Sequence, residues 1–326
     1  MTTLLSVADY SVDYITQRST VRALDEVNLT LPGPVVVGIV GESGSGKSTL
    51  GLSIGRMLPT IAECVGGDLK LEGNSMLTAS YKVMRKLRRK RLGFVFQDPM
   101  TALDPTMKIG RQIALAMGDG CSSDEINELL SHVGLTDASR IAAKYPHQLS
   151  GGMAQRVVIA IAISRQPALL VADEPTASLD ATLRDHILEL LVSLCTNMNT
   201  GIVLLSHELR VVARHCEQVA VMYAGRVVEN GKTSIVFAHP AHAYTHALLA
   251  AAPGLERPGE TLQSIPGAPP VLSGKTEGCG FEPRCHFASE CCRFERPAAR
   301  SFSGRIVLCH NAEKVLNSDM QSRKER

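Results

Sequence analysis

The sequence contains no tryptophan, and aromatic residues make up only 4% of its 326 residues. The charge is nearly balanced, with 34 Lys and Arg against 32 Asp and Glu and a formal net charge of +2, so composition alone does not indicate a nucleic-acid-binding protein. Hydrophobic residues account for 44% and charged residues for 20%, as is typical of a soluble globular protein. A chain of this length can bury its core without stapling by disulfides.

Long apolar runs are also missing. The most apolar stretches, such as VVIAIAIS at residues 157–164, are shorter than the roughly 18 residues that a membrane-spanning helix requires. The first residues, MTTLLSVADY, lack a basic region followed by an apolar core and a cleavage site, so we expect no secretion signal. Any membrane role is therefore expected to come through a partner, and nine cysteines in a reducing cytoplasm favour free thiols or metal ligands.

Strand and helix patterns alternate along much of the chain. The apolar run at residues 35–40 predicts a strand buried on both faces, followed by a glycine-rich turn and a helix from about Gly46. The rhythm returns at residues 168–173 with a helix at 181–197, and at residues 201–206 with a helix from Glu208. This alternation indicates an α/β fold with a mainly parallel sheet.

Two other regions interrupt this pattern. Residues 101–164 lose the strand signal and include SSDE at 122–125, a capping-box spacing, so we interpret them as an inserted helical subdomain. After residue 235 the chain becomes rich in proline, glycine and cysteine. We therefore divide it into a main domain at 1–235 and a C-terminal extension at 236–326 that carries a cysteine cluster.

The run KVMRKLRRKR at residues 82–91 contains seven basic residues. It could contact nucleic acid or anionic lipid. A solvated helix face is the favoured interpretation, because no second basic patch and no stacking aromatic residues accompany it.

The motif GESGSGKS at residues 41–48 fits a phosphate-binding loop and lies between a predicted buried strand and a helix. Its backbone N–H groups can surround phosphate oxygens, Lys47 can reach the β- and γ-phosphates of ATP, and Ser48 can supply a hydroxyl to Mg²⁺. The nucleotide contacts expected here are Ser43, Gly44, Ser45, Gly46, Lys47, Ser48 and Thr49.

Two further motifs suit the same chemistry. LLVADEP at residues 169–175 ends a predicted buried strand with two acids, of which Asp173 is expected to hold Mg²⁺ and Glu174 to deprotonate an attacking water. LSGGMAQR at residues 149–156 opens a helix with Ser150, Gly151 and Gly152, which predicts a second anion-binding helix start.

With FQDP at residues 96–99, SLD at 178–180 and SH at 206–207 also present, the chain resembles the ATP-binding-cassette superfamily over nearly its whole length. The resemblance implies a RecA-like P-loop core with an antiparallel β region and an inserted helical subdomain. It also implies that cassettes pair head to tail, so that the residues at 150–152 of one subunit close on ATP held by the other. Further implied roles are Mg²⁺ and water sensing by Gln97, γ-phosphate contact by His207, a dimer-seam position for Asp180 and adenine stacking by Tyr14.

Within this superfamily the chain is most similar to ATPase subunits of peptide and nickel importers. YPHQLSGGMAQRV, HPAHAYTHALLAAAP, IPGAPP and the cysteine tail carry that likeness. It implies a motor subunit at the cytoplasmic face of the inner membrane, working with an identical or paralogous ATP-binding subunit, two transmembrane permease subunits and, indirectly, a solute-binding protein. No nucleic acid is expected as a partner. The alternative is a soluble cassette acting in translation or DNA repair, although such chains usually carry two cassettes or a long coiled-coil insertion.

The cysteine tail allows several interpretations. Cys279, Cys285, Cys292 and Cys309 could bind zinc or an iron–sulfur cluster, with Cys291 as a neighbour of the third ligand. No C-x2-C pair favours zinc, although His286 and His310 could complete a mixed site. The importer resemblance points to a structural [4Fe-4S] cluster, and unligated thiols remain the alternative.

Overall fold

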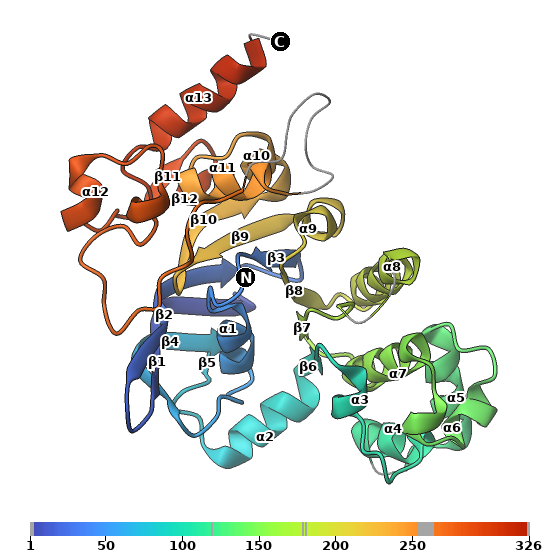
Figure 1. Cartoon of the computed structure of the whole chain (residues 1–326). Helices are drawn as coiled ribbons and strands as arrows, with labels where there is room; N and C mark the ends of the chain where they lie inside the picture. The colour runs from blue at the N-terminus through green and yellow to red at the C-terminus, as the bar shows by residue number, and fades with distance from the viewer. Residues whose placement is uncertain (1–2, 119, 178, 180, 253–263, 325–326) are drawn as a thin grey trace. The chain divides into compact units, whose positions relative to one another are not determined.

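The computed structural model describes residues 3–118, 120–177, 179, 181–252 and 264–324, and Figure 1 labels its elements. The chain divides into two compact units. The first contains Met1–Gly33, Val37–Thr78 and Leu205–Arg326, and the second contains Pro34–Val36 and Ala79–Leu204. Each unit has its own strands, helices and buried side chains.

An antiparallel sheet forms the beginning of the first unit. Its strand order is β2 (Thr20–Leu31), β1 (Leu5–Ile15), β4 (Ala62–Leu71) and β5 (Asn74–Ser75). Leu5 of β1 lies opposite Leu31 of β2 and Leu71 of β4, and all three side chains are fully buried. This register directs one face of the sheet into the core of the unit.

A second sheet in this unit begins with β3 (Val36–Val40), whose five residues are all buried. β3 runs parallel to β9 (Gln218–Tyr223), and β9 pairs antiparallel with β10 (Arg226–Lys232). Two short strands from the C-terminal extension continue the sheet, because β12 (Arg305–Val307) pairs with β10 and β11 (Arg300–Phe302) pairs with β12. The expected domain boundary after residue 235 thus separates strands that share one sheet (Figure 1).

The helices of the first unit are α1 (Lys47–Ile54), α9 (Leu209–His215), α10 (Thr233–Ala238), α11 (Ala243–Ala250), α12 (Glu290–Phe294) and α13 (Ala312–Lys324), with a 3-10 turn, η2 (Glu282–Arg284). A buried carboxylate joins several of these elements. Glu229 of β10 accepts hydrogen bonds from the N–H groups of Ala241 (3.0 Å) and His242 (2.9 Å), just before α11, and from Arg305 Nη1 (3.2 Å) on β12. The ion pair between Glu229 and Arg305 links the extension to the sheet.

The second unit contains the parallel strands β6 (Leu92–Val95) and β7 (Leu169–Asp173), followed in the sheet order by β8 (Gly201–Ser206), which ends in the first unit. Its helices are α2 (Tyr81–Lys90), α3 (Pro99–Ala102), α4 (Ile109–Met117), α5 (Ser123–His132), α6 (Ala138–Ala142), η1 (Pro146–Gln148), α7 (Gly151–Ile163) and α8 (Ala181–Asn197). The capping box predicted at residues 122–125 is present at the start of α5.

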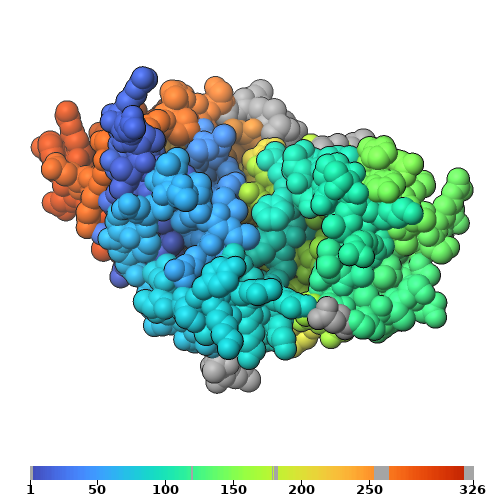
Figure 2. Space-filling model, turned by 90° about the horizontal axis from the view of Figure 1, so that it is seen from below, coloured from blue at the N-terminus to red at the C-terminus, as the bar shows by residue number. Residues whose placement is uncertain are grey.

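The basic run forms α2, an amphipathic helix on the surface. Met84 and Leu87 are its buried residues, whereas most of its basic side chains are exposed. The cyan residues of this segment can be followed on the face shown in Figure 2. This exposure agrees with a solvated helix face, which stays a prediction.

The predicted strands at residues 35–40, 168–173 and 201–206, and the helices after each of them, are present as β3, β7 and β8 with α1, α8 and α9. The α/β expectation is confirmed. Among the helices in the described ranges, none combines the length and the apolar character that crossing a bilayer would need.

Candidate functional site

The phosphate loop, residues 41–48, connects β3 to α1 in the first unit. A Cβ atom on Gly41 would lie 2.2 Å from the carbonyl oxygen of Met222, in β9. Gly46 has a φ of 103°, and a Cβ atom there would lie 2.6 Å from the carbonyl oxygen of Ala23, in β2. Glycine is required at both positions, because any side chain would push the loop away from the two sheets that support it.

The side chain of Lys47 is hydrogen-bonded to the backbone of the phosphate loop. Its Nζ donates hydrogen bonds to the carbonyl oxygens of Gly41 (2.8 Å) and Glu42 (3.0 Å). The N–H of Ser45 also donates to the Glu42 carbonyl (3.2 Å). Ser43, Gly44 and Ser48 are exposed, so the outer surface of the loop and the N-terminus of α1 can be reached by an anion.

Two other predicted nucleotide contacts lie in the same unit. Tyr14, near the end of β1, is half-buried, and its hydroxyl lies 3.3 Å from the hydroxyl of Thr49 on α1. His207 directly follows β8 and is exposed. Tyr14 therefore contacts α1, the helix that follows the phosphate loop. The stacking of Tyr14 on adenine stays a prediction.

The second unit brings together the acids and the glutamine. Asp173 is the last residue of β7, and Glu174 follows it with a φ of 44°, in the left-handed region that a non-glycine residue rarely adopts. Gln97 comes just after β6, and its Nε2 lies 3.4 Å from Glu174 Oε2. The two meet because β6 and β7 are parallel neighbours whose carboxyl ends share one edge of the sheet.

Ser150 is the N-cap of α7, and its hydroxyl accepts a hydrogen bond from the N–H of Met153 (3.4 Å). Gly151 is exposed, while a Cβ atom on Gly152 would lie 2.6 Å from a methyl group of Leu183 on α8. The small residues therefore open the helix start to solvent and let α7 approach α8. Asp180, which is expected at the dimer seam, lies outside the described residues.

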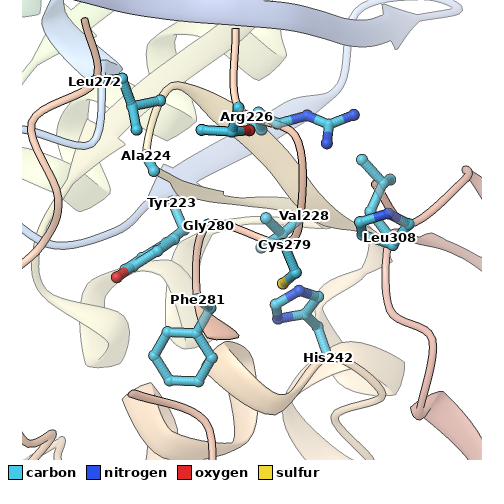
Figure 3. A pocket seen from close by; sticks show the side chains of 12 residues that line it. Tyr223, Ala224, Arg226, Val228, His242, Leu272, Cys279, Gly280, Phe281 and Leu308 are labelled. Carbon is cyan, nitrogen blue, oxygen red and sulfur yellow. The ribbon is translucent and has the colours of Figure 1, made fainter. Parts of the chain in front are cut away.

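The cysteine segment, residues 279–292, is part of the first unit. The N–H of Cys279 donates to the carbonyl of Cys292 (2.8 Å), which brings the two ends of the segment together. The amide of Asn311 donates to the carbonyl of Phe287 (2.8 Å) and lies 3.5 Å from the Cys292 sulfur. Figure 3 shows Cys279 beside His242 at a cavity of about 20 Å³, which is room for about one water molecule.

Four thiols of this region influence one another. Burial raises the pKa of Cys279 to about 11 and that of Cys285 to about 12, and in both cases charge on Cys292 or Cys309 would raise the pKa further. Backbone N–H groups oppose the shift by donating to the sulfurs, from Phe281 to Cys279 and from Phe287 to Cys285. As isolated thiolates these groups would be unfavourable, because they are buried and repel one another.

No set of three or more His, Cys, Asp or Glu side chains is arranged to hold a metal ion in the part of the chain that the structure describes. The structure therefore does not show the iron–sulfur cluster expected from the sequence, which stays a prediction. The same finding applies to the zinc alternative, since zinc needs four close ligands around one ion.

Three residues near the phosphate loop were missed by the sequence analysis. Arg284, in η2, forms a two-pronged ion pair with Glu42 of the loop, and the Tyr244 hydroxyl of α11 accepts a hydrogen bond from the Glu42 N–H (2.9 Å). Arg284 follows Glu42 by 242 residues in the sequence, so no local pattern could have paired them.

Comparison with known families gives two matches along the chain. The family described as ABC transporter matches residues 24–177, and the family described as oligopeptide/dipeptide transporter, C-terminal region, matches residues 228–292. The second match includes the cysteine segment and ends before Cys309.

Two similar proteins are oligopeptide transport ATP-binding proteins named OppD. The one from Salmonella typhimurium is 40% identical over 319 residues, which cover 96% of this chain and 95% of that protein. The one from Haemophilus influenzae is 40% identical and covers 97% of this chain and 100% of that protein.

Two solved structures are also similar. A dimer of the ATP-binding cassette MJ0796 bound to ADP and Pi gives a TM-score of 0.63 at 28% identity, covering 70% of this chain and 98% of that one. CbiO1 from Clostridium perfringens, part of the ABC transporter complex CbiONQ, gives a TM-score of 0.62 at 29% identity, covering 73% of this chain and 92% of that one.

Proposed function

This chain belongs to the ABC transporter family as an ATP-binding and ATP-hydrolysing subunit, and we propose that it drives the import of peptides or related small solutes. The observation that carries the proposal is the phosphate loop between β3 and α1, in a chain whose C-terminal region matches the oligopeptide/dipeptide transporter family. The OppD proteins are similar to this chain along almost its full length, including the extension, which supports the peptide class.

The proposed chemistry assigns one role to each motif. The phosphate loop and Lys47 would bind the phosphates of ATP, and Ser48 and Asp173 would each supply an oxygen ligand to Mg²⁺. Glu174 is the general base for the attacking water, and Gln97, 3.4 Å from its carboxylate, positions that water and the metal. His207 contacts the γ-phosphate, and Tyr14 stacks on the adenine.

The proposed assembly is a head-to-tail pair of cassettes, supported by the dimeric structure of MJ0796. Ser150, Gly151 and Gly152 of each subunit complete the ATP site of the other, with Asp180 at the seam. The pair acts at the cytoplasmic face of the membrane on two permease subunits, which receive solute from a solute-binding protein. A cassette of translation or DNA repair is not favoured, because the match at residues 228–292 is to a transporter region.

The test of the ATP site uses two variants of the purified protein. Glu174→Gln should lower ATP turnover by about 10²–10⁴-fold while MgATP still binds, because the amide cannot accept the proton from water. Lys47→Ala should lose nucleotide binding. Near-normal turnover in Glu174→Gln would reject Glu174 as the base, and recovery of the native protein with ribosomes or DNA and never with membranes would reject the importer role.

We further propose that Cys279, Cys285, Cys292 and Cys309 hold a [4Fe-4S] cluster that staples the extension. Four thiolates are the donor set of such clusters, and hydrogen bonds to the sulfurs are a common feature of their sites. The mutual influence of these four thiols and the N–H groups that donate to their sulfurs support the proposal. A positively charged metal core would supply the compensation that buried, mutually repelling thiolates need.

Cys291 provides a matched control for this ligand set. It precedes Cys292 directly but is more exposed, and both sulfurs lie 3.3 Å from the Ser289 hydroxyl. Protein purified without oxygen should contain iron and sulfide, which Cys292→Ser should lose and Cys291→Ser should keep. Loss of iron in Cys291→Ser alone would show that the ligand set is wrong, and absence of iron from the native protein would reject the cluster.

A further inference from the structure

A cation from the cysteine segment reaches the phosphate loop directly. Arg284 lies between Cys279 and Cys285, in the turn η2. Its Nη1 donates to Glu42 Oε2 (2.8 Å) and its Nη2 to Glu42 Oε1 (3.0 Å), so guanidinium and carboxylate form two parallel hydrogen bonds. Such two-pronged pairs combine charge with a defined orientation, which makes them strong and specific.

The surroundings of Arg284 keep its guanidinium in this place. The side chain is only 6% exposed, its Nε donates to the carbonyl of Pro266 (2.7 Å), and its Nη1 lies 3.2 Å from the Tyr223 hydroxyl. The ring of Phe281 packs edge-on against Tyr223 and Tyr244, and Figure 3 shows Phe281 beside Tyr223. The hydrogen-bonded Glu42 carboxylate raises the pKa of Arg284, so the cation is permanent.

Glu42 is held by the extension at two points and contacts the loop at a third. Arg284 binds its carboxylate, and the Tyr244 hydroxyl accepts a hydrogen bond from its N–H (2.9 Å). Its carbonyl accepts hydrogen bonds from Lys47 Nζ (3.0 Å) and the Ser45 N–H (3.2 Å). The extension therefore sets the backbone position of Glu42, whose carbonyl accepts the hydrogen bond from Lys47.

We propose that Arg284 is a positioning residue of the ATP site, through which the fold of the cysteine segment sets the affinity of the phosphate loop for nucleotide. This inference rests on the proposed ATP-binding role of the loop. The turn that carries Arg284 is closed by the N–H of Glu282, which donates to the Cys279 carbonyl (3.0 Å), and by the N–H of Cys285, which donates to the Glu282 carbonyl (3.1 Å). A disturbance of either cysteine is thus transmitted to Glu42.

The test measures binding of a fluorescent ATP analogue with Mg²⁺ to the full-length protein. Arg284→Met should raise the Kd about tenfold and raise the KM for ATP while kcat stays within about twofold, because the loop is misplaced but the hydrolytic residues are untouched. Arg284→Lys should recover part of the affinity, since it restores the charge without the second prong. Glu42→Gln should match Arg284→Met, and the double variant should be no worse than either, because both remove one interaction.

Arg296→Met is the matched control. Arg296 belongs to the same extension, and its ion pairs are with Asp25 and Glu26 of β2 instead of with a residue of the phosphate loop. The Kd of the Arg296→Met variant for the ATP analogue should stay within about twofold of the native value. An equal loss of affinity in Arg296→Met would refute a specific role of Arg284, since it would reflect general loosening of the extension.

A cysteine variant tests the link to the segment. Cys285→Ser should raise the Kd in the native background but not in the Arg284→Met background, and an unchanged Kd in the native background would refute the link. Native affinity in Arg284→Met together with lost binding in Lys47→Ala would overturn this inference and leave the ATP site standing. Native affinity in Lys47→Ala would instead overturn the proposed ATP site itself.

Discussion

His242 should make the protein sensitive to mild acid. Its ring is 1% exposed at the start of α11, where Nδ1 accepts a hydrogen bond from the N–H of Tyr244 (3.0 Å) and Nε2–H donates to the Leu308 carbonyl. Figure 3 shows the ring beside Cys279. Burial lowers the pKa of His242 from 6.5 to about 3, and nearby Arg226 opposes the cationic form as well. Protonation would also destroy the acceptor that caps the helix.

The size of the effect follows from the two pKa values. The unfolded chain takes up a proton on this histidine below a pH of about 6.5, whereas the folded chain does so only near a pH of about 3. The unfolded state therefore binds more protons between these limits, and the free energy of unfolding falls as the pH falls. Between pH 7 and pH 5 the loss from this group alone is about 2 kcal/mol.

The assay is urea unfolding at pH 7 and at pH 5, for the native protein and for His242→Asn. Asparagine can still cap the helix but does not titrate, so the variant should start less stable and should lose about 2 kcal/mol less than the native protein over this range. Comparing the two proteins removes the contributions of other titrating groups. Equal losses in both proteins would refute the assignment of a buried, neutral His242.

Two further predictions concern the buried ion pair and the phosphate loop. Arg305→Met should cost about 3 kcal/mol of unfolding free energy, since it leaves the buried Glu229 carboxylate without its cationic partner. Urea unfolding should show a far smaller cost for Lys70→Met at the exposed pair with Asp68. Similar costs in both would contradict the structural role of Arg305. Gly46→Ala should weaken MgATP binding at least about tenfold, because its Cβ would meet the Ala23 carbonyl at 2.6 Å, whereas Gly33→Ala, which meets nothing within 4 Å, should bind normally. Native affinity in Gly46→Ala would contradict the packing argument.

Much of the fold and of the ATP site could be predicted because its signals are local. A buried strand, a glycine-rich turn and a Lys-Ser pair occupy consecutive positions, so the loop at residues 41–48 and the helix after it were correctly anticipated. Ser150 was likewise predicted to start a helix, and it is the N-cap of α7. Gln97 was expected at the site only from the family resemblance, and it meets Glu174 because parallel strands end at a common edge.

Other features depended on contacts between distant segments. Spacing alone did not show that β11 and β12 of the extension would join the sheet of β9 and β10, because three-residue strands carry no periodic signal. The ion pair between Arg284 and Glu42 could not be predicted from local sequence either, since each residue alone is an ordinary polar residue in a turn.

The sequence by itself determined the motifs from which the chemistry is proposed. Lys47, Asp173, Glu174 and the glycines of the two helix starts belong to short motifs whose backbone geometry is set by their own residues. Only the tertiary structure decided how the extension relates to that chemistry. The extension supplies Arg284, Tyr244 and a strand to the unit that holds the phosphate loop. The physical reason is that charge pairing and close packing depend on distance in space, which separation along the chain does not encode.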